Sequence, residues 1–378
     1  MIDLPSWTEN IVDLDIDQMV SGLTFSPEGK ALYWTVPTRR DPAHGIPHDH
    51  ELHRYDLNSG DLSVVVQFPS SFIPSEMHLL GSGRNLAVYG LPTSVLNLSE
   101  MAPQVFVVDV VTGRITADIR LDDVKAGQIK IETAEVEGPC CHLYSPGLAW
   151  DLEKELLYIV HADEDVITVI DLAKGELLQR TDISPRMSLL KRLKNWLVPL
   201  VEAKLVPGTL RRVVLSADGT RLYVLGLRQE MTRESNGEWG QREIPLGLQV
   251  IATDDLSLIH RLDLPASNLA LSPDGERLLL VGSLEAFSES AGLQYEDNGL
   301  YFFDTKTFED VGHLQPDVAF SLLGFSPDSR YAYVSQPADP GHKYWTKVLQ
   351  VLDLESQRFV TELENTFARL IPVTASRR

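Results

Sequence analysis

A four-residue turn recurs along the chain and constrains its fold more than any other feature. The clearest copies have the pattern Ser-Pro-Asp-Gly or a close variant, and weaker copies have lost part of it. The clear copies are residues 26–29, 216–219, 272–275 and 326–329, and the weaker ones are residues 81–84 and 151–154. Proline presets φ near about −65° at the second position, and glycine accepts a positive φ at the last. Each copy lies between apolar runs and therefore predicts a β-hairpin.

Each turn belongs to a longer repeated unit with four apolar runs. The run after the turn is apolar throughout, as in Leu-Leu-Tyr-Ile-Val at residues 156–160. The third run often ends in Asp-x-x-x-Gly, a second tight turn. These third runs are residues 52–57, 105–110, 166–172, 248–253, 300–304 and 348–354. Continuous β-branched and aromatic runs are typical of strands buried on both faces, so we expect six four-stranded units.

With these turns and runs, the chain resembles YVTN-type, WD-repeat-like β-propellers over about residues 20–365. The Gly-His and Trp-Asp markers of strict WD repeats do not recur, and neither does a quinoprotein tryptophan-docking motif. The resemblance implies an all-β fold, a β-propeller of four-stranded antiparallel blades. We expect residues 1–378 to form a single propeller domain.

The two ends of the chain add a further strand-like segment each, at residues 10–17 and 368–373. Joining both segments in one terminal blade would close the ring and remove the free sheet edges. We therefore favour seven blades, with six as the alternative.

The long connections are expected on one face of the disc. Strands A to D of a blade alternate in direction, so the B–C and D–A connections share one face and the tight turns lie on the other. The long B–C segments are residues 36–49, 90–103, 226–247, 283–298 and 336–346, and the long D–A segments are residues 120–146 and 181–210. Loops of this length are uncommon unless they carry function or are disordered, so we place the binding surface on this face.

One of these connections, residues 182–207, has the pattern of an amphipathic helix. Its apolar side consists of Leu189, Leu190, Leu193, Trp196, Leu197 and Leu200, while Lys191 and Lys194 lie opposite. Residues 186–204 carry five positive charges and one negative charge. Three interpretations stay open: a helix packed on its own propeller, a helix docked on a partner protein, or a helix lying on a membrane surface.

Four of the ten histidines lie within the thirteen residues 41–53, in and just after the first B–C segment: His44, His48, His50 and His53. In an extended strand His48 and His50 point the same way, and His44 could fold back across Gly45 to complete a three-nitrogen site. Such a site would suit zinc or another transition metal. The alternative is a set of surface histidines that interact with neighbouring carboxylates and water.

The only two cysteines are adjacent, in the sequence Cys140-Cys141-His142 close to the expected channel mouth. Adjacent Cα atoms lie about 3.8 Å apart, below the usual span of about 4.4–6.8 Å for a disulfide. A bridge between them would be strained and easily reduced, which would suit a redox role. The alternative is a pair of buried free thiols.

Motifs for known enzyme mechanisms are scarce. The sequence contains no Gly-x-Ser-x-Gly elbow, phosphate loop, dinucleotide fingerprint or His-Glu-x-x-His motif. Propellers with lactonase-like activity place carboxylates and asparagine at the channel mouth, and the nearest equivalent here is Glu296-Asp297-Asn298. An Asp-Asn-Gly sequence before a strand is also a common turn.

The net charge of the chain limits the classes of molecule that it can bind. The chain has 33 Lys and Arg against 54 Asp and Glu, a net charge of −21, which opposes the binding of nucleic acid. It has no apolar segment long enough for a membrane-spanning helix and no signal peptide as given. We therefore expect a cytoplasmic or membrane-peripheral protein, or an extracytoplasmic one if the chain is a mature or trimmed form.

Two functional hypotheses follow. The first is a non-catalytic β-propeller that binds a protein partner through its loop-rich face, as a subunit of a membrane-associated assembly, without a cofactor. The second is a metal-assisted hydrolase or lactonase-like enzyme with its site at the channel mouth. The two differ in whether carboxylates, imidazoles and a metal converge in one polar cavity.

Overall fold

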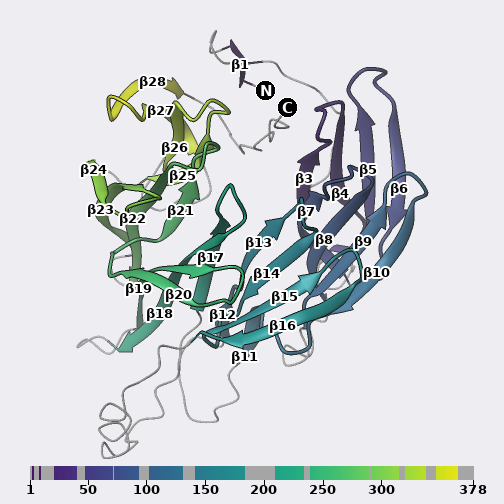
Figure 1. The fold of residues 1–378 in the computed structure, drawn as a ribbon, viewed down its shortest axis with the longest axis horizontal. Coiled ribbons are helices and arrows are strands. Elements are labelled where there is room, and N and C mark those ends of the chain that lie inside the picture. Colours follow the sequence, from purple (N-terminus) through teal and green to yellow (C-terminus); the bar gives the residue numbers. More distant parts are fainter. Residues whose placement is uncertain are drawn as a thin grey trace, which may run out of the picture.

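Every regular element that the structure describes is a β-strand (Figure 1). The computed structural model describes residues 2–3, 8–9, 21–40, 47–70, 72–92, 102–130, 141–183, 209–233, 239–288, 292–314, 320–337 and 346–364. Within these ranges it contains no helix.

Six four-stranded antiparallel units follow one another along the chain. Blade 1 comprises β3 (Ser21–Phe25), β4 (Ala31–Arg40), β5 (Pro47–Asp56) and β6 (Leu62–Gln67). Blade 2 comprises β7 (Phe72–Leu79), β8 (Asn85–Pro92), β9 (Gln104–Asp109) and β10 (Arg114–Arg120). Blade 3 comprises β13 (Gly147–Asp151), β14 (Leu156–Val160), β15 (Val166–Asp171) and β16 (Glu176–Asp182).

The second half of the chain repeats this arrangement. Blade 4 comprises β17 (Thr209–Leu215), β18 (Arg221–Arg233), β19 (Trp239–Ala252) and β20 (Leu258–Leu262). Blade 5 comprises β21 (Asn268–Leu271), β22 (Arg277–Ser288), β23 (Gly292–Asp304) and β24 (Asp310–Leu314). Blade 6 comprises β25 (Ser321–Phe325), β26 (Tyr331–Pro337), β27 (Thr346–Asp353) and β28 (Arg358–Glu364). Two short pairs complete the set, β1 (Ile2–Asp3) with β2 (Thr8–Glu9), and β11 (Gly127–Lys130) with β12 (Cys141–Tyr144).

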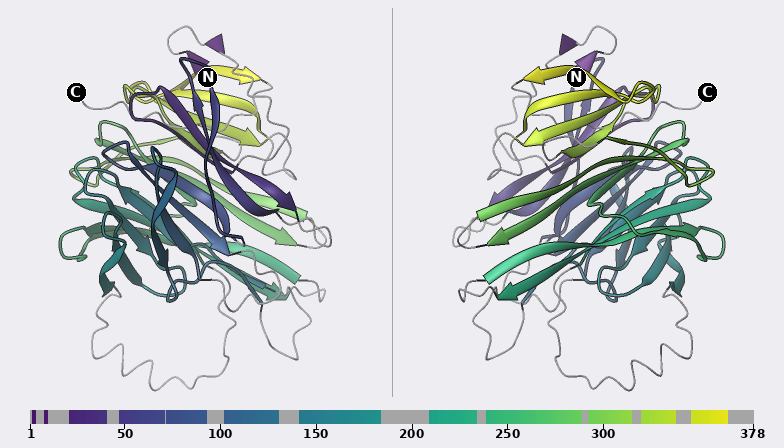
Figure 2. Two further views of the ribbon diagram at one scale, coloured as in Figure 1. Left: turned by 90° about the vertical axis from the view of Figure 1, so that its right-hand side faces the viewer. Right: turned by 90° about the vertical axis from the view of Figure 1, so that its left-hand side faces the viewer.

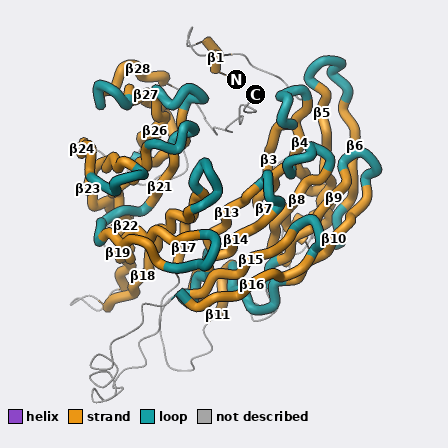
Figure 3. The backbone as a smooth tube through the Cα atoms, viewed as in Figure 1, coloured by secondary structure: helices purple, strands orange, loops and turns teal. Residues whose placement is uncertain are grey.

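The blades are arranged as in a β-propeller, which confirms the expected fold class. The first strands of successive blades contact one another, for example β13 with β17 and β17 with β21, so these strands line the centre. Figures 1 and 3 show the sheets following one another around an arc, with blade 6 and blade 1 standing apart at its two ends. The predicted terminal blade uses residues 10–17 and 368–373, which lie outside the described residues, so the choice between seven and six blades stays a prediction.

The hydrophobic core lies between the blades. In β14, Leu157 and Ile159 join a buried cluster with blade 2, while Tyr158 and Val160 join another with blade 4. Three more clusters link blades 1 and 2, blades 4 and 5, and blades 5 and 6. Side chains alternate between the two faces of a strand, so a strand placed between two neighbours must be apolar on both. This explains the continuous apolar runs of the sequence.

The recurring turn is held by its serine and its acidic residue. The Ser272 hydroxyl donates to Asp274 Oδ1 over 2.6 Å and accepts a hydrogen bond from the Arg277 amide over 2.9 Å. Ser216 and Ser326 make the equivalent pair of bonds in their own blades. Gly275 ends the turn with a φ of 74°. The predicted hairpins are therefore confirmed, and the serine explains why the pattern begins with that residue.

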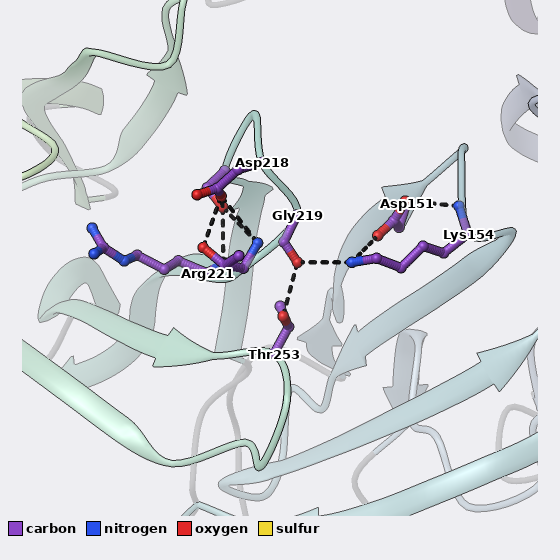
Figure 4. Close-up of polar contacts among 8 residues, drawn as sticks. Asp151, Lys154, Asp218, Gly219, Arg221 and Thr253 are labelled. Carbon is purple, nitrogen blue, oxygen red and sulfur yellow. Dashed lines mark hydrogen bonds and ion pairs between the residues drawn. The ribbon is translucent and has the colours of Figure 1, made fainter.

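Neighbouring blades are also joined through these turns (Figure 4). Lys154 of blade 3 forms an ion pair with Asp151 over 3.1 Å and donates to the Gly219 carbonyl of blade 4 over 3.3 Å. The Thr253 hydroxyl donates to the same carbonyl over 2.8 Å. The bond from Lys154 to Gly219 thus connects blade 3 to blade 4 on the tight-turn face, which gives these turns a structural role.

The outer strand of every blade contains a β-bulge near its start. The extra residues are Val65, Thr116, Leu178, Ile259, Val311 and Val360. A bulge twists an exposed strand and interrupts its row of main-chain hydrogen-bonding groups, which discourages pairing with another chain. The six bulge residues differ in type and in their neighbours, from Thr116 between Ile115 and Ala117 to Val311 between Asp310 and Gly312, so no shared sequence pattern marks the bulges.

Two glycines of the recurring turn provide a matched test of packing between blades. A Cβ atom added at Gly275 would lie 2.7 Å from the Cβ atom of Ala217, whereas one added at Gly29 would have nothing within 4 Å. Both glycines have positive φ. We expect Gly29→Ala to lower the free energy of unfolding by about 1 kcal/mol, from the backbone alone, and Gly275→Ala by about 3 kcal/mol. Urea denaturation measures both, and equal losses would contradict the close approach of blades 4 and 5.

The carboxylates of the turns make the stability of the folded state depend on pH. Arg84 and the amides of Thr112 and Val111 lower the pKa of Asp109 to about 2, and bonds from Ser216 and Thr220 lower that of Asp218 to about 2. Both values lie below the ordinary 3.8, so these groups stabilise the folded state above about pH 4 and lose that effect as the pH falls towards 2. We expect Asp109→Asn to flatten the loss of thermal stability between pH 4 and pH 2. An unchanged slope would contradict the lowered pKa.

Candidate interaction face

The two faces of the disc differ in their connections. On one face, every described turn between strands A and B or C and D has four or five residues. On the other face the strands run on, and Figure 2 shows the β18–β19 and β22–β23 hairpins extending to the same side. The prediction of one elaborated face therefore holds for the described residues.

The elaborations are mostly strands, and the prediction of loops at residues 36–49, 226–247 and 283–298 is wrong. The described parts of these segments continue β4 and β5, β18 and β19, and β22 and β23, while residues 41–46, 234–238 and 289–291 lie outside the described residues. Within residues 120–146, β11 and β12 form a hairpin as well. The face therefore carries paired strands in place of several predicted loops.

Glycine bulges explain the error in blades 4 and 5. The register shifts at Gly226, opposite Leu246 and Gly247, and again at Gly282, opposite Asn298 and Gly299. Gly247 and Gly299 have φ values of 78° and 84°. A Cβ atom at Gly282 would lie 2.8 Å from the Cβ atom of Asn298. Glycine at the end of an apolar run predicts a strand end, but here it bends a strand that continues.

The bent hairpins of blades 4 and 5 meet and form one sheet. Gly240, Gln241 and Arg242 of β19 pair with Ser288, Phe287 and Ala286 of β22, which joins the two blades in an eight-stranded sheet. We call residues 227–233, 239–246, 283–288 and 292–298 the projecting sheet. The Glu285 amide donates to the Glu243 carboxylate over 3.0 Å, which links the hairpins a second time.

Two adjacent arginines of β17 stand at the base of the projecting sheet. The Arg211 guanidinium binds Asp165 over 2.8 Å, and its side chain is 9% exposed. Arg212 donates to the Ser267 carbonyl over 3.0 Å, and Glu243 and Glu285 act on it electrostatically. Desolvation by burial lowers the pKa of both arginines, and the carboxylates oppose that effect. The arginines thus neutralise acidic groups where blades 3, 4 and 5 meet.

A second set of ion pairs fixes the short B–C connection of blade 3. Lys125 binds Asp163 over 2.8 Å, and Arg180 binds Asp123 over 2.8 Å and Glu164 over 3.3 Å. The bond between Lys125 and Asp163 ties the approach to β11 to blade 3. These carboxylates are held by cations of the chain itself.

The predicted channel-mouth group at residues 296–298 serves the bulge of blade 5. Asp297 Oδ1 accepts a hydrogen bond from the Gly299 amide over 2.9 Å, and the Asn298 side chain donates to the Gly282 carbonyl over 3.0 Å. The Glu296 side chain is exposed to solvent. The Asp-Asn-Gly sequence is a bulge within β23, so the interpretation of a turn before the strand is also corrected.

The described histidines of blade 1 have different surroundings and do not form a common site. His53 interacts with Glu51 over 3.2 Å and its ring lies 5.8 Å from that of Trp34, centroid to centroid, while His50 is buried. Asp49, between His48 and His50, has a φ of 49°, so the extended backbone that the metal hypothesis assumed is interrupted there. His44 lies outside the described residues. Among the residues that the structure describes, no three His, Cys, Asp or Glu side chains form a metal site, and the complete site stays a prediction.

The remaining predicted sites are described only in part. Cys141 and His142 lie in β12, opposite Lys130 and Ile129, and Cys140 lies outside the described residues. The redox hypothesis therefore stays a prediction. Apart from Asp182 and Ile183, the amphipathic segment at residues 182–207 also lies outside them, with all its contact residues: Leu189, Leu190, Lys191, Leu193, Lys194, Trp196, Leu197 and Leu200. The described residues contain no helix with the length and apolar character needed to cross a membrane.

Comparisons with known proteins support the architecture. Models of protein families and curated proteins give no match to this chain. Among solved structures, the periplasmic gluconolactonase PpgL of Pseudomonas aeruginosa matches with a TM-score of 0.50 and 18% identity over 91% of this chain and 85% of that one. The β-propeller domain of Myceliophteria thermophila Cps50 (Swd1) matches with a TM-score of 0.50 and 13% identity over 93% and 88%.

A chain from a mitotic checkpoint complex also matches, with a TM-score of 0.52 and 11% identity over 93% of this chain and 81% of that one. At these identities the matches define the class, a β-propeller, and go no further. They include a gluconolactonase and a member of a protein complex, so the fold alone is compatible with an enzymatic role and with a binding role.

The link between the two hairpins can be tested at a single amide. We expect Glu243→Ala to increase hydrogen exchange at the Glu285 amide by about tenfold, because that amide loses its acceptor. Glu243→Gln keeps an acceptor oxygen and should leave the exchange close to wild type. Equal protection in both variants, measured by NMR, would show that the carboxylate does not hold the hairpins together.

Proposed function

We propose that this chain is a non-catalytic propeller of the YVTN or WD-repeat-like type that binds a protein partner through the face carrying the projecting sheet. The observation that carries the proposal is the joining of two hairpins from different blades into one sheet above the disc. Such a surface is already ordered before binding, so little conformational entropy is lost when a partner docks.

Structural contacts of several acidic groups on this face support the binding proposal. Asp163 and Asp165 are paired with Lys125 and Arg211, and the bonds of Asp297 Oδ1 go to the bulge of blade 5. The hydrolase or lactonase-like alternative needs several free acid–base groups in one cavity. Phe287, on the projecting sheet, is 47% exposed, as is common for an anchor residue at a protein interface.

The wider proposal is a subunit of a membrane-associated assembly in a cytoplasmic or membrane-peripheral location. It is supported by the basic, amphipathic sequence of residues 182–207, which belongs to a connection on the same face. In this proposal the segment contacts the partner or the membrane surface, while the projecting sheet holds the partner.

A pair of surface substitutions tests the role of the face. Phe287 and Leu178 have similar exposures, 47% and 50%, but Leu178 lies on the outer strand of blade 3. We expect Phe287→Ser to weaken a complex isolated from the source cells by about tenfold, and Leu178→Ser to leave it intact. Native mass spectrometry after affinity capture measures the bound fraction. Recovery of free monomer alone from wild-type cells would contradict the proposed function.

A further inference from the structure

Among the described strands, β23 has a neighbour on one side only where it enters the projecting sheet. The part of β23 that lies within blade 5, from Leu300 to Phe303, pairs with β24. From Gly292 to Asp297 it pairs with β22 on one side, and no described residue pairs with it on the other. The register with β22 is regular over this stretch, from Ser288↔Gly292 to Ser283↔Asp297.

The direction of the main-chain groups at this edge follows from one hydrogen bond. The Glu285 amide donates to Glu243 on β19, so the main-chain groups of Glu285 point away from β23. In an antiparallel sheet, the main-chain N–H and C=O groups of successive residues point to opposite edges of the strand. For two directly opposed residues, these groups point either both towards the other strand or both away from it. Tyr295 lies opposite Glu285, so its N–H and C=O groups point outwards, and those of Leu293 do the same.

This edge differs from the outer strands of the blades. Each of those six strands is interrupted by a bulge close to its start, as at Leu178 and Val311. The stretch from Gly292 to Asp297 has no register shift, and it is long enough to hold a strand of usual length. It therefore lacks the bulge that the outer strands of the blades have in common.

The charge of the hairpin specifies the chemistry of a partner. The charged residues in its described part, 282–288 and 292–299, are Glu285, Glu296 and Asp297, and none is basic. The Glu296 side chain is exposed, and the chain as a whole carries a net charge of −21. A strand added at this edge would therefore be favoured by lysine or arginine and opposed by acidic side chains.

We propose that the partner supplies an extended basic segment that adds to β23 as a further antiparallel or parallel strand along residues 292–297. This inference rests on the proposed function, since it names how the partner is held. The main-chain groups of Leu293 and Tyr295 supply the hydrogen bonds, and Glu296 selects positive side chains on the added strand.

The test uses the full-length protein and two synthetic hexapeptides, one alternating valine and lysine and one alternating valine and glutamate. Fluorescence anisotropy at physiological salt measures binding. We expect saturable binding of the lysine peptide only. Tyr295→Pro removes an outward N–H without touching the pairing to β22, and it should weaken binding by about tenfold. Tyr295→Thr keeps the N–H and serves as the matched control, with binding within about twofold of that of the wild-type protein.

A second variant keeps the test decisive if Tyr295→Pro does not fold. Glu296→Lys changes an exposed side chain, and it should reverse the preference from the lysine peptide to the glutamate peptide. Absence of saturable binding, equal binding by the Pro and Thr variants, or an unchanged preference in Glu296→Lys would overturn the inference. If the complex in source cells still depends on Phe287, the proposed function survives that result. If wild-type protein is recovered there only as free monomer, the proposed function fails as well.

Discussion

The propeller depends on apolar packing between sheets, because each blade forms its core with its neighbours. β14 contributes Leu157 to a cluster with blade 2 and Tyr158 to a cluster with blade 4, so it has no face left for solvent. A single blade would expose both apolar faces and could not persist alone. The hydrogen bond from Lys154 to Gly219 and the close approach of Gly275 to Ala217 join neighbouring blades at the spacing that this packing requires.

The parts of the fold that were predictable from the sequence are local. The turn at Ser272 and the run at residues 278–281 are specified by residues close together in the chain, so their pattern identifies a hairpin directly. The course of the chain beyond Gly226 and Gly282 was not predictable, because glycine occurs both at strand ends and at bulges within strands. Beyond the bulges each hairpin pairs with itself, as at Leu227 with Pro245, and the pairing of β19 with β22 then joins residues more than 40 positions apart.

The candidate site shows the same division. The sequence draws attention to unusual residues, such as the histidines near His50 and the adjacent cysteines, because rare residue types stand out in a pattern. The described face is organised by common residues, through the pairs of Arg211 with Asp165 and Lys125 with Asp163 and the bond of Glu243 to the Glu285 amide. No spacing in the sequence indicates these pairs, since each depends on how separate connections are brought together by the blades.

The joining of the β18–β19 and β22–β23 hairpins has a consequence for how such a chain can change over generations. Adding or deleting residues in one hairpin would shift its strand against the other and break the pairing of Arg242 with Ala286. A tolerated change of length in blade 4 must therefore be accompanied by a compensating change in blade 5. Homologous chains should keep these two hairpins matched in length, while the hairpin of blade 1, whose described strands share no sheet with another blade, is free to vary.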